Sequence, residues 1–173
     1  DAFVAISNDV VREFKNAGIP TEHISLIPNG VDTEIFSPVQ STEKLELRKR
    51  FGISPAAIVF AYSGRLTTEK GLESVMRVWN RLKAERDDVY LIFIGSGKDM
   101  SLSCEEQLRE FAKINQLESS ISFVGAVDNV ADYLQCADIF IFPSRTEALG
   151  LALIEAQSCG IAAIGARVGG IPD

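Results

Sequence analysis

The chain has 173 residues, of which 46% are apolar and 24% are charged, and its formal net charge is −7. This length suffices for one domain with a buried core. The acidic balance argues against nucleic acid as a partner, because phosphate backbones are bound by basic surfaces. The sequence has no apolar run long enough to span a bilayer and no charged-then-apolar leader, so we expect neither a transmembrane segment nor a signal peptide.

The cysteines and the histidine argue against metal binding and against a serine-type catalytic triad. Cys104, Cys136 and Cys159 are odd in number and lack the spacing of metal ligands, which is typical of buried, reduced thiols in a cytoplasmic protein. His23 is the only histidine, so neither a serine-type catalytic triad nor a histidine-rich metal site is expected. The sequence therefore predicts no metal site.

The first part of the chain predicts a small unit that cannot enclose a core alone. Its pattern indicates a strand, a helix with Asn8 as a candidate cap, and a second strand, at 3–7, 8–17 and 24–27. Both ends of the sequence look cut. We therefore interpret residues 1–34 as the tail of a preceding domain with its interdomain link, and residues 35–173 as the main domain, truncated at its carboxyl end.

Helices and strands alternate through the rest of the chain. Strands are expected at 58–62, 90–94, 121–124, 139–142 and 161–164, and helices at 41–51, 71–86, 103–116, 130–135 and 151–159. The strand at 139–142 is uniformly apolar, as in a parallel strand covered on both faces. Alternation at roughly 30-residue spacing predicts βαβ units and an α/β fold with a doubly wound parallel sheet.

Three helix details follow from the same pattern. Leu45 and Leu47 are the expected apolar contacts of the first of these helices, and Trp79 falls on the apolar face of the second and is predicted to lie in the core. Ser103 and Glu106 have the spacing of a capping box, which predicts that the third helix begins at residue 103.

The loops that follow the strands carry the functional candidates. In a parallel sheet the carboxyl ends of all strands lie along one edge, where open α/β sheets bind ligands. We therefore expect one rim to hold Arg65, Lys70, Gly95, Gly97, Val127, Glu147 and Gly150.

Arg65 and Lys70 are the sharpest feature of this rim. Lys70 stands at the start of a helix, where the helix dipole disfavours a cation. A bound anion would reverse that effect, which favours a diphosphate held by both cations. The alternative is a solvated loop with two ordinary surface charges, and the residues alone support both interpretations.

The glycine loop at Gly95 and Gly97 is a weaker signal. Glycines after a strand often serve only a tight turn, and no third glycine completes a dinucleotide fingerprint. The loop therefore favours a packing role over a ligand-binding one, and NAD-type binding loses support.

Glu147 and Glu155 bracket the last loop and helix. Eight helical residues rise about 12 Å, whereas glycosidase carboxylates lie roughly 5 to 9.5 Å apart, so the pair fits two ends of one extended ligand better. The alternative is a solvent-facing Glu147 and a Glu155 paired with a surface lysine. The amino end of the helix, at Leu149, Gly150 and Leu151, would offer free backbone N–H groups to a phosphate.

Four ordered motifs resemble the donor-binding half of glycosyltransferase family 4, the retaining GT-B enzymes formerly called group 1 glycosyl transferases. They are IPNGVDTEIFSP, SGRLTTEKGL, FIGSGKD and the stretch from ISFVG to QSCG. The resemblance covers nearly the whole chain and implies a Rossmann-like domain that forms one half of a GT-B fold. It implies no cofactor and no obligatory metal, with a nucleotide diphosphate sugar of UDP or GDP type as substrate.

The resemblance also implies roles for single residues. Arg65 and Lys70, with Gly64 in the Gly-Arg motif, would contact the donor diphosphate, and Glu147 would face the hydroxyls of the transferred sugar. These cations and Glu147 are the implied catalytic residues. Glu155 would bind the ribose hydroxyls. Backbone groups at Leu149, Gly150 and Leu151 would contact the phosphates, and Val127 would meet the base mainly through its backbone. Gly95 and Gly97 would belong to the family's glycine loop, on the donor-binding side.

Departures from the family pattern leave alternatives open. Ala148 and Leu149 stand where Gly-Phe is usual, which affects the shape of the sugar pocket.

We expect a carbohydrate or lipid-linked acceptor to be bound by a missing amino-terminal domain, so that this fragment binds donor without turnover. The location is expected to be cytoplasmic, or peripheral at the inner membrane face through the missing domain. The alternatives are a non-catalytic nucleotide-binding or partner-docking module and a sugar-nucleotide epimerase.

Overall fold

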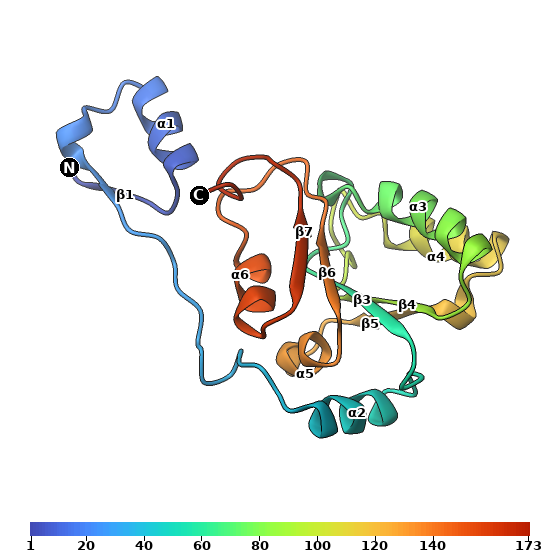
Figure 1. Ribbon diagram of the computed structural model, residues 1–173. Helices are drawn as coiled ribbons and strands as arrows, with labels where there is room; N and C mark the ends of the chain where they lie inside the picture. Colours follow the sequence, from blue (N-terminus) through green and yellow to red (C-terminus); the bar gives the residue numbers. More distant parts are fainter.

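The computed structural model describes residues 1–173 and contains two separate parallel sheets (Figure 1). The larger sheet has five strands in the order β5-β4-β3-β6-β7. Its strands are β3 Ile58–Ser63, β4 Val89–Ile94, β5 Ile121–Gly125, β6 Ile139–Phe142 and β7 Ala162–Gly165. All four strand pairs are parallel. Every predicted strand is present within two residues of its expected bounds.

The helices cover both faces of the larger sheet. They are α2 Ser41–Arg50, α3 Leu72–Glu85, α4 Glu105–Ile114, α5 Val130–Gln135 and α6 Leu151–Ser158. Helices α3 and α4 lie on one face, and α5 and α6 lie on the other, with α2 against α5 (Figure 1). Within this sheet the chain enters at the central strand β3, continues through β4 to the edge strand β5, and then returns to β6 and β7 on the other side of β3. This is the doubly wound, Rossmann-like arrangement predicted from the sequence.

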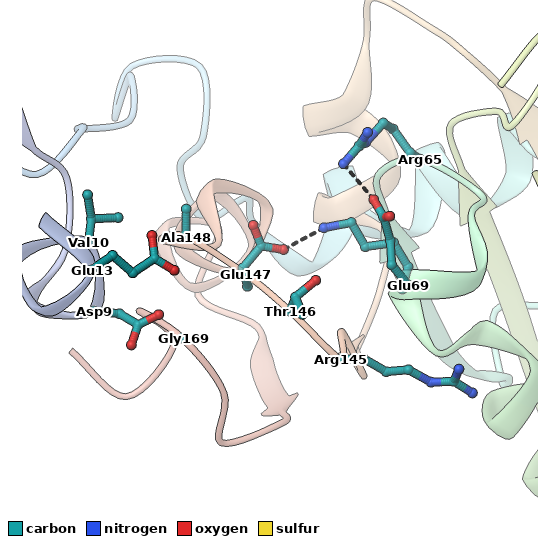
Figure 2. Close-up of a pocket in the computed structure, with 11 residues that line it drawn as sticks. Asp9, Val10, Glu13, Arg65, Glu69, Arg145, Thr146, Glu147, Ala148 and Gly169 are labelled. Carbon is teal, nitrogen blue, oxygen red and sulfur yellow. Dashed lines mark hydrogen bonds and ion pairs between the residues drawn. The ribbon is translucent and has the colours of Figure 1, made fainter. Parts of the chain in front are cut away.

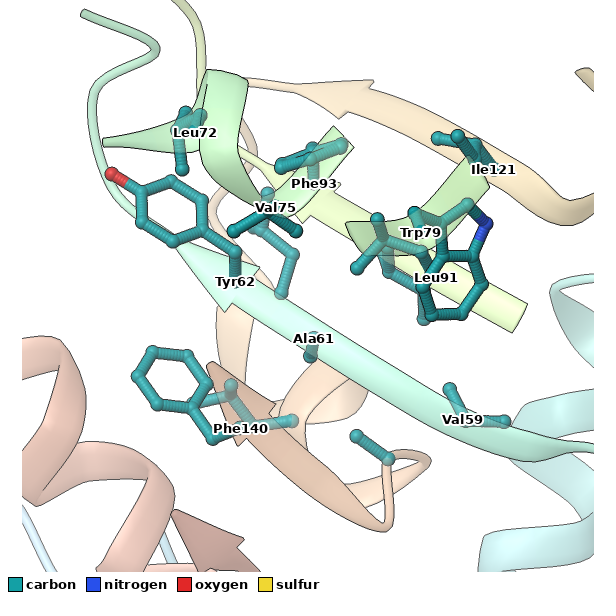
Figure 3. Close-up of a cluster of buried hydrophobic side chains, with 14 of the residues drawn as sticks. Val59, Ala61, Tyr62, Leu72, Val75, Trp79, Leu91, Phe93, Ile121 and Phe140 are labelled. Carbon is teal, nitrogen blue, oxygen red and sulfur yellow. The ribbon is translucent and has the colours of Figure 1, made fainter. Parts of the chain in front are cut away.

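The core between the sheet and α3 is formed by the residues that the helical spacing placed on one face (Figure 3). Leu72, Val75 and Trp79 point onto Leu91 and Phe93 of β4 and its neighbours. The Trp79 ring is 2% exposed, and its Nε1 donates to Ser120 Oγ at 3.2 Å. Burying one such large side chain contributes about 1.5 to 3 kcal/mol, and the prediction that Trp79 lies in the core is confirmed.

All three cysteines are free and buried. Burial raises the pKa of Cys136 to about 12 and that of Cys159 to about 11, with Glu155 adding to the latter. It also raises the pKa of Cys104. The thiols are therefore protonated at neutral pH, and the prediction that they are buried and reduced is confirmed.

The amino-terminal unit consists of β1 Phe3–Ala5, α1 Asn8–Asn16 and β2 Ile24–Leu26. Strands β1 and β2 pair in parallel, and an extended stretch joins the unit to α2 (Figure 1). The cap of α1 is Ser7 rather than Asn8. Ser7 has extended backbone angles and its side chain accepts from Val10 N at 3.2 Å, as an N-cap residue requires.

Two helix predictions are wrong. Helix α4 begins at Glu105, with Cys104 as its cap residue, because Ser103 is held in a bridge to Thr67 of the loop after β3. The Ser103 hydroxyl accepts from Glu105 N at 3.4 Å, and no capping box forms. Leu45 is 45% exposed, whereas Leu47 is buried as expected.

Polar contacts fasten α2 to the amino edge of the sheet. The buried Arg48 donates to Asp138 Oδ2 at 2.6 Å and to the Cys136 carbonyl at 3.0 Å. Lys44 donates to Asp138 Oδ1 at 2.7 Å, and the Val59 N–H donates to Asp138 Oδ2 at 2.8 Å. Asp138 therefore ties α2, β3 and β6 together. None of the helices has the length and apolarity needed to cross a membrane.

Candidate functional site

A cleft of about 390 Å³ lies at the carboxyl edge of the larger sheet, between α1 and the loops that follow β3 and β6 (Figure 2). Most of its lining residues are polar or charged. They are Asp9, Val10, Glu13, Arg65, Glu69, Lys70, Arg145, Thr146, Glu147, Ala148 and Gly169. The cleft thus brings together three residues singled out from the sequence: Arg65, Lys70 and Glu147.

Lys70 and Glu147 both line the cleft and form an ion pair, which is the dashed line that ends at Glu147 in Figure 2. Lys70 Nζ lies 2.7 Å from Glu147 Oε2, and the two side chains are only 10% and 17% exposed. Ser144 Oγ donates to the same carboxylate oxygen at 3.3 Å. Lys70 ends a short 3-10 turn directly before α3. The alternatives of an ordinary surface charge at Lys70 and of a solvent-facing Glu147 are therefore wrong, whereas the Arg65 side chain is 58% exposed, as the first alternative expects.

Arg65 lines the same cleft, and a hydrogen bond from Tyr62 holds its backbone. Its guanidinium donates to Glu69 Oε1 at 2.9 Å and remains 58% exposed. The Tyr62 hydroxyl donates to the Arg65 carbonyl at 2.9 Å. Burial raises the pKa of Tyr62, with the charge of Glu147 acting in the same direction, so the phenol stays a neutral donor. Sequence reasoning missed this anchor because Tyr62 reads only as an apolar strand residue.

Arg145 is a third cation of the cleft that sequence reasoning missed. Its backbone N–H donates to the Glu69 carbonyl at 2.8 Å, which ties the loop after β6 to the loop after β3. Its guanidinium lies 3.3 Å from Glu73 Oε2. The signal was a basic residue in the loop that also carries Glu147.

Helix α1 supplies an acidic wall opposite these cations (Figure 2). Asp9 and Glu13 point toward the cleft, and Asp9 is paired with Arg12 of its own helix at 2.7 Å. Helix α1 is held near the end of the chain, where Asn8 N donates to Asp173 Oδ2 at 2.5 Å. Nothing in the sequence pattern placed α1 against these loops.

The backbone N–H groups at the amino end of α6 are free to donate hydrogen bonds. Its first residue follows Gly150, which has φ +89° and would bring a Cβ within 3.2 Å of Phe142, so the turn favours glycine. No side chain caps the helix, and the N–H groups of Gly150, Leu151 and Ala152 donate to no atom of the chain. Such an end attracts anions through its dipole and its free N–H groups.

Glu155 lies one helical turn further along α6, outside the lining of the cleft. It is half-buried and has no ion-pair partner, so the alternative that it pairs with a surface lysine is wrong. Burial raises the pKa of this carboxyl. An unpaired, half-buried carboxylate is poised to accept hydrogen bonds from a ligand's hydroxyl groups.

The glycine loop packs against the loop after β3. A Cβ on Gly95 would lie 2.1 Å from the Gly64 carbonyl oxygen, and one on Gly97 would lie 2.3 Å from that of Leu66. Close backbone approach therefore accounts for both glycines. Val127 is half-buried against the core. Neither this loop nor Val127 lines the cleft, and their contacts with a ligand remain predictions.

Acidic side chains near the cleft do not gather as metal ligands would. No group of three or more His, Cys, Asp and Glu side chains is arranged to hold an ion. Glu105 instead binds the glycine loop, accepting from Ser96 Oγ at 2.7 Å and from Gly97 N at 2.8 Å.

The sequence model of the family described as glycosyl transferases group 1 matches residues 43–173, which is most of the chain. The chain belongs to the group 1 glycosyl transferases. Over its whole length it is 31% identical to a GDP-mannose-dependent monoacylated alpha-(1-6)-phosphatidylinositol monomannoside mannosyltransferase from Corynebacterium glutamicum. The matched part is 46% of that protein. It is also 28% identical over its whole length to the N-acetyl-alpha-D-glucosaminyl L-malate synthase of Bacillus anthracis, and the matched part is 43% of that protein.

Solved structures share the fold. The Anabaena protein HepE, solved in complex with UDP and glucose, superposes on 98% of this chain with a TM-score of 0.87 at 21% identity, over 45% of its own length. The carboxyl-terminal domain of a group 1 family protein from Francisella tularensis superposes on 83% of this chain with a TM-score of 0.72 at 23% identity, over 74% of its own length. The present chain therefore has the Rossmann-like fold of one half of a GT-B glycosyl transferase, and it spans less than half the length of the curated relatives named above.

Proposed function

We propose that this chain is the donor-binding half of a retaining glycosyl transferase that uses a nucleotide diphosphate sugar of UDP or GDP type without an obligatory metal. The observation that carries the proposal is that Arg65 and Lys70 line one cleft with Glu147, and that the uncapped amino end of α6 begins just after Glu147. These cations and the free N–H groups of α6 would together bind a diphosphate. The relatives' names agree with this substrate class, since one is GDP-mannose-dependent and HepE was solved with UDP and glucose.

Each group would have its own task in transfer. Arg65, Lys70 and the free N–H groups of α6 would stabilise the diphosphate as the bond between the sugar carbon and the phosphate oxygen breaks and its electron pair moves to that oxygen. The acceptor hydroxyl would attack the same face of the sugar and pass its proton to the departing phosphate oxygen. Glu147 would bind hydroxyls of the transferred sugar, and Glu155 those of the ribose.

The acceptor is proposed to be a carbohydrate or a lipid-linked molecule bound mainly by another part of the full-length protein, with this chain alone binding donor but not turning it over. Residues 1–34 are assigned to that other part and its link, and 35–173 to the donor domain. The proposed location is the cytoplasm or its membrane face. The acidic wall of α1 would then border the acceptor side of the cleft.

A thermal-shift panel of UDP, GDP, ADP and CDP with their common sugar conjugates tests the proposal. Ligand at a hundredfold its Kd stabilises by about 2.7 kcal/mol, which for a chain of this size raises Tm by about 5 to 11 °C. We expect this rise with one base, its loss in Arg65→Ala, and its retention in Arg81→Ala, which removes an exposed arginine of α3. No rise with any nucleotide would contradict donor binding.

A further inference from the structure

The ion pair of Lys70 and Glu147 occupies the place where the proposed diphosphate would bind. From its burial and geometry we infer that Glu147 makes the site discriminate between the intact nucleotide sugar and the free nucleoside diphosphate that is left after transfer. The inference rests on the proposed function. It assigns to Glu147 a role in selecting the donor over its own product.

Each cation of the cleft is paired with a carboxylate of the chain. Lys70 faces Glu147 at 2.7 Å, Arg65 faces Glu69 at 2.9 Å, and Arg145 faces Glu73 at 3.3 Å. A diphosphate that enters this cleft therefore meets cations and their counter-ions together. How much each counter-ion opposes the diphosphate depends on how far water can screen it.

Glu147 is the counter-ion that water screens least. Its side chain is 17% exposed and that of Lys70 is 10% exposed, whereas those of Glu69 and Arg65 are 29% and 58% exposed. Charges shielded from solvent interact more strongly, and a buried charge that loses its partner is costly. The Arg65–Glu69 pair resembles an ordinary surface pair of small energetic consequence.

A free nucleoside diphosphate would bind against this charge. Lys70 has three N–H donors and can hold a phosphate oxygen and Glu147 together. The terminal phosphate would then lie beside the Glu147 carboxylate, and two anions in a poorly screened site repel each other. The site therefore disfavours the bare diphosphate.

A sugar on the terminal phosphate changes this balance in two ways. It removes one ionisable oxygen from that phosphate, which lowers the negative charge facing Glu147. It also brings hydroxyl donors to a carboxylate whose Oε1 accepts no hydrogen bond from the chain. A hydrogen bond to a charged acceptor is among the stronger ones in proteins. Glu147 therefore favours the intact donor and promotes release of the spent nucleotide.

Isothermal titration calorimetry on the chain tests this with two matched ligand pairs, UDP with UDP-glucose and GDP with GDP-mannose. The quantity compared is the Kd of the diphosphate divided by the Kd of its sugar conjugate, for whichever pair binds. In Glu147→Gln we expect this ratio to fall about tenfold, with tighter binding of the diphosphate and weaker binding of the conjugate. Glu147→Asp keeps the charge and should keep the diphosphate as weakly bound as in the unmodified chain.

Glu69→Gln is the matched control, since it also removes one negative charge from the lining of the cleft. It should alter the two affinities by the same factor and leave the ratio unchanged. A ratio that stays the same in Glu147→Gln, or that falls equally in Glu69→Gln, would overturn the inference while leaving donor binding intact. Binding of neither pair would overturn both the proposed function and this inference. Melting curves of each variant confirm that it is folded.

Discussion

The Tyr62 hydroxyl donates a hydrogen bond to the Arg65 carbonyl oxygen at 2.9 Å, from a side chain with no exposed surface. Tyr62 lies near the end of the central strand β3, so its position is fixed by the core. The loop that carries Arg65 and Lys70 is thereby anchored to the central strand of the sheet. This contact connects the stability of the fold with the geometry of the proposed diphosphate site.

Tyr62→Phe removes this anchor while keeping the ring. We expect the free energy of unfolding to fall by about 1 kcal/mol, the typical contribution of one hydrogen bond. The affinity for a nucleoside diphosphate should fall about threefold to tenfold, because Arg65 loses its preset position. Calorimetric titration and urea unfolding measure the two effects. Tyr90→Phe makes the same change in a strand residue outside the cleft and should leave the affinity as it was.

Asp138→Asn tests the polar contacts that hold α2. Burial alone would raise the pKa of Asp138, but hydrogen bonds from Lys44 and the Val59 N–H, together with the charges of Lys44 and Arg48, hold it below its usual value. Because the folded-state pKa is lowered, the carboxylate stabilises the fold above the unfolded-state pKa of about 3.9, and this stability is lost as pH falls through the folded-state value.

We expect Asp138→Asn to lower the free energy of unfolding at pH 7 by about 1 to 3 kcal/mol, less than for a fully buried pair because the Asp138 side chain is 33% exposed. The deficit should shrink below about pH 4 and vanish at lower pH. Urea unfolding at several pH values measures it. Asp88→Asn, which breaks an exposed pair with Arg86, should show no comparable loss. A deficit independent of pH would contradict the electrostatic explanation.

The sheet and the centre of the cleft were predictable from the sequence because both follow from local patterns. Uniform apolar runs such as 139–142 mark buried parallel strands, and the carboxyl ends of such strands meet at one edge. That rule alone placed Lys70 and Glu147 together, although 77 residues separate them.

Other features depend on contacts that no local pattern encodes. The start of α4 was predicted at Ser103, but Ser103 forms a bridge to Thr67 and the helix begins at Glu105. Arg48 is buried although it carries a charge, because carbonyl groups and Asp138 compensate for that charge. The acidic wall of α1 was missed because the packing of the amino-terminal unit against residue 173 is a tertiary contact.

Thr67→Val removes a buried hydroxyl that has no hydrogen-bond partner. Thr67 is 2% exposed and its Oγ1 is unpaired. Because an unpaired buried hydroxyl costs on the order of 1 to 3 kcal/mol and valine has the same shape, we expect the free energy of unfolding to rise by about 1 kcal/mol. Thermal or urea unfolding measures the change. The same substitution at the exposed Thr42 of α2 should stay within about 0.5 kcal/mol, and a loss of stability in Thr67→Val would show that the hydroxyl is needed.

Glu155→Gln should separate a cost to stability from a gain in binding. Burial raises the pKa of this unpaired carboxyl, so its charged form opposes folding above the unfolded-state pKa of about 4.3. At pH 7 the glutamine variant should be more stable by at most about 1 kcal/mol, because the side chain is only half-buried. That gain should disappear as pH falls below about 4.

The same variant should bind ribonucleotides about tenfold more weakly, since a hydrogen bond from a ribose hydroxyl to a carboxylate is stronger than one to an amide. A 2′,3′-dideoxy analogue of the same nucleotide lacks those hydroxyls and should lose little affinity. Titration of both ligands into Glu155→Gln measures this, with Glu110→Gln on α4 as a surface control. Equal losses for the two ligands would assign Glu155 a structural role and remove it from the ribose site.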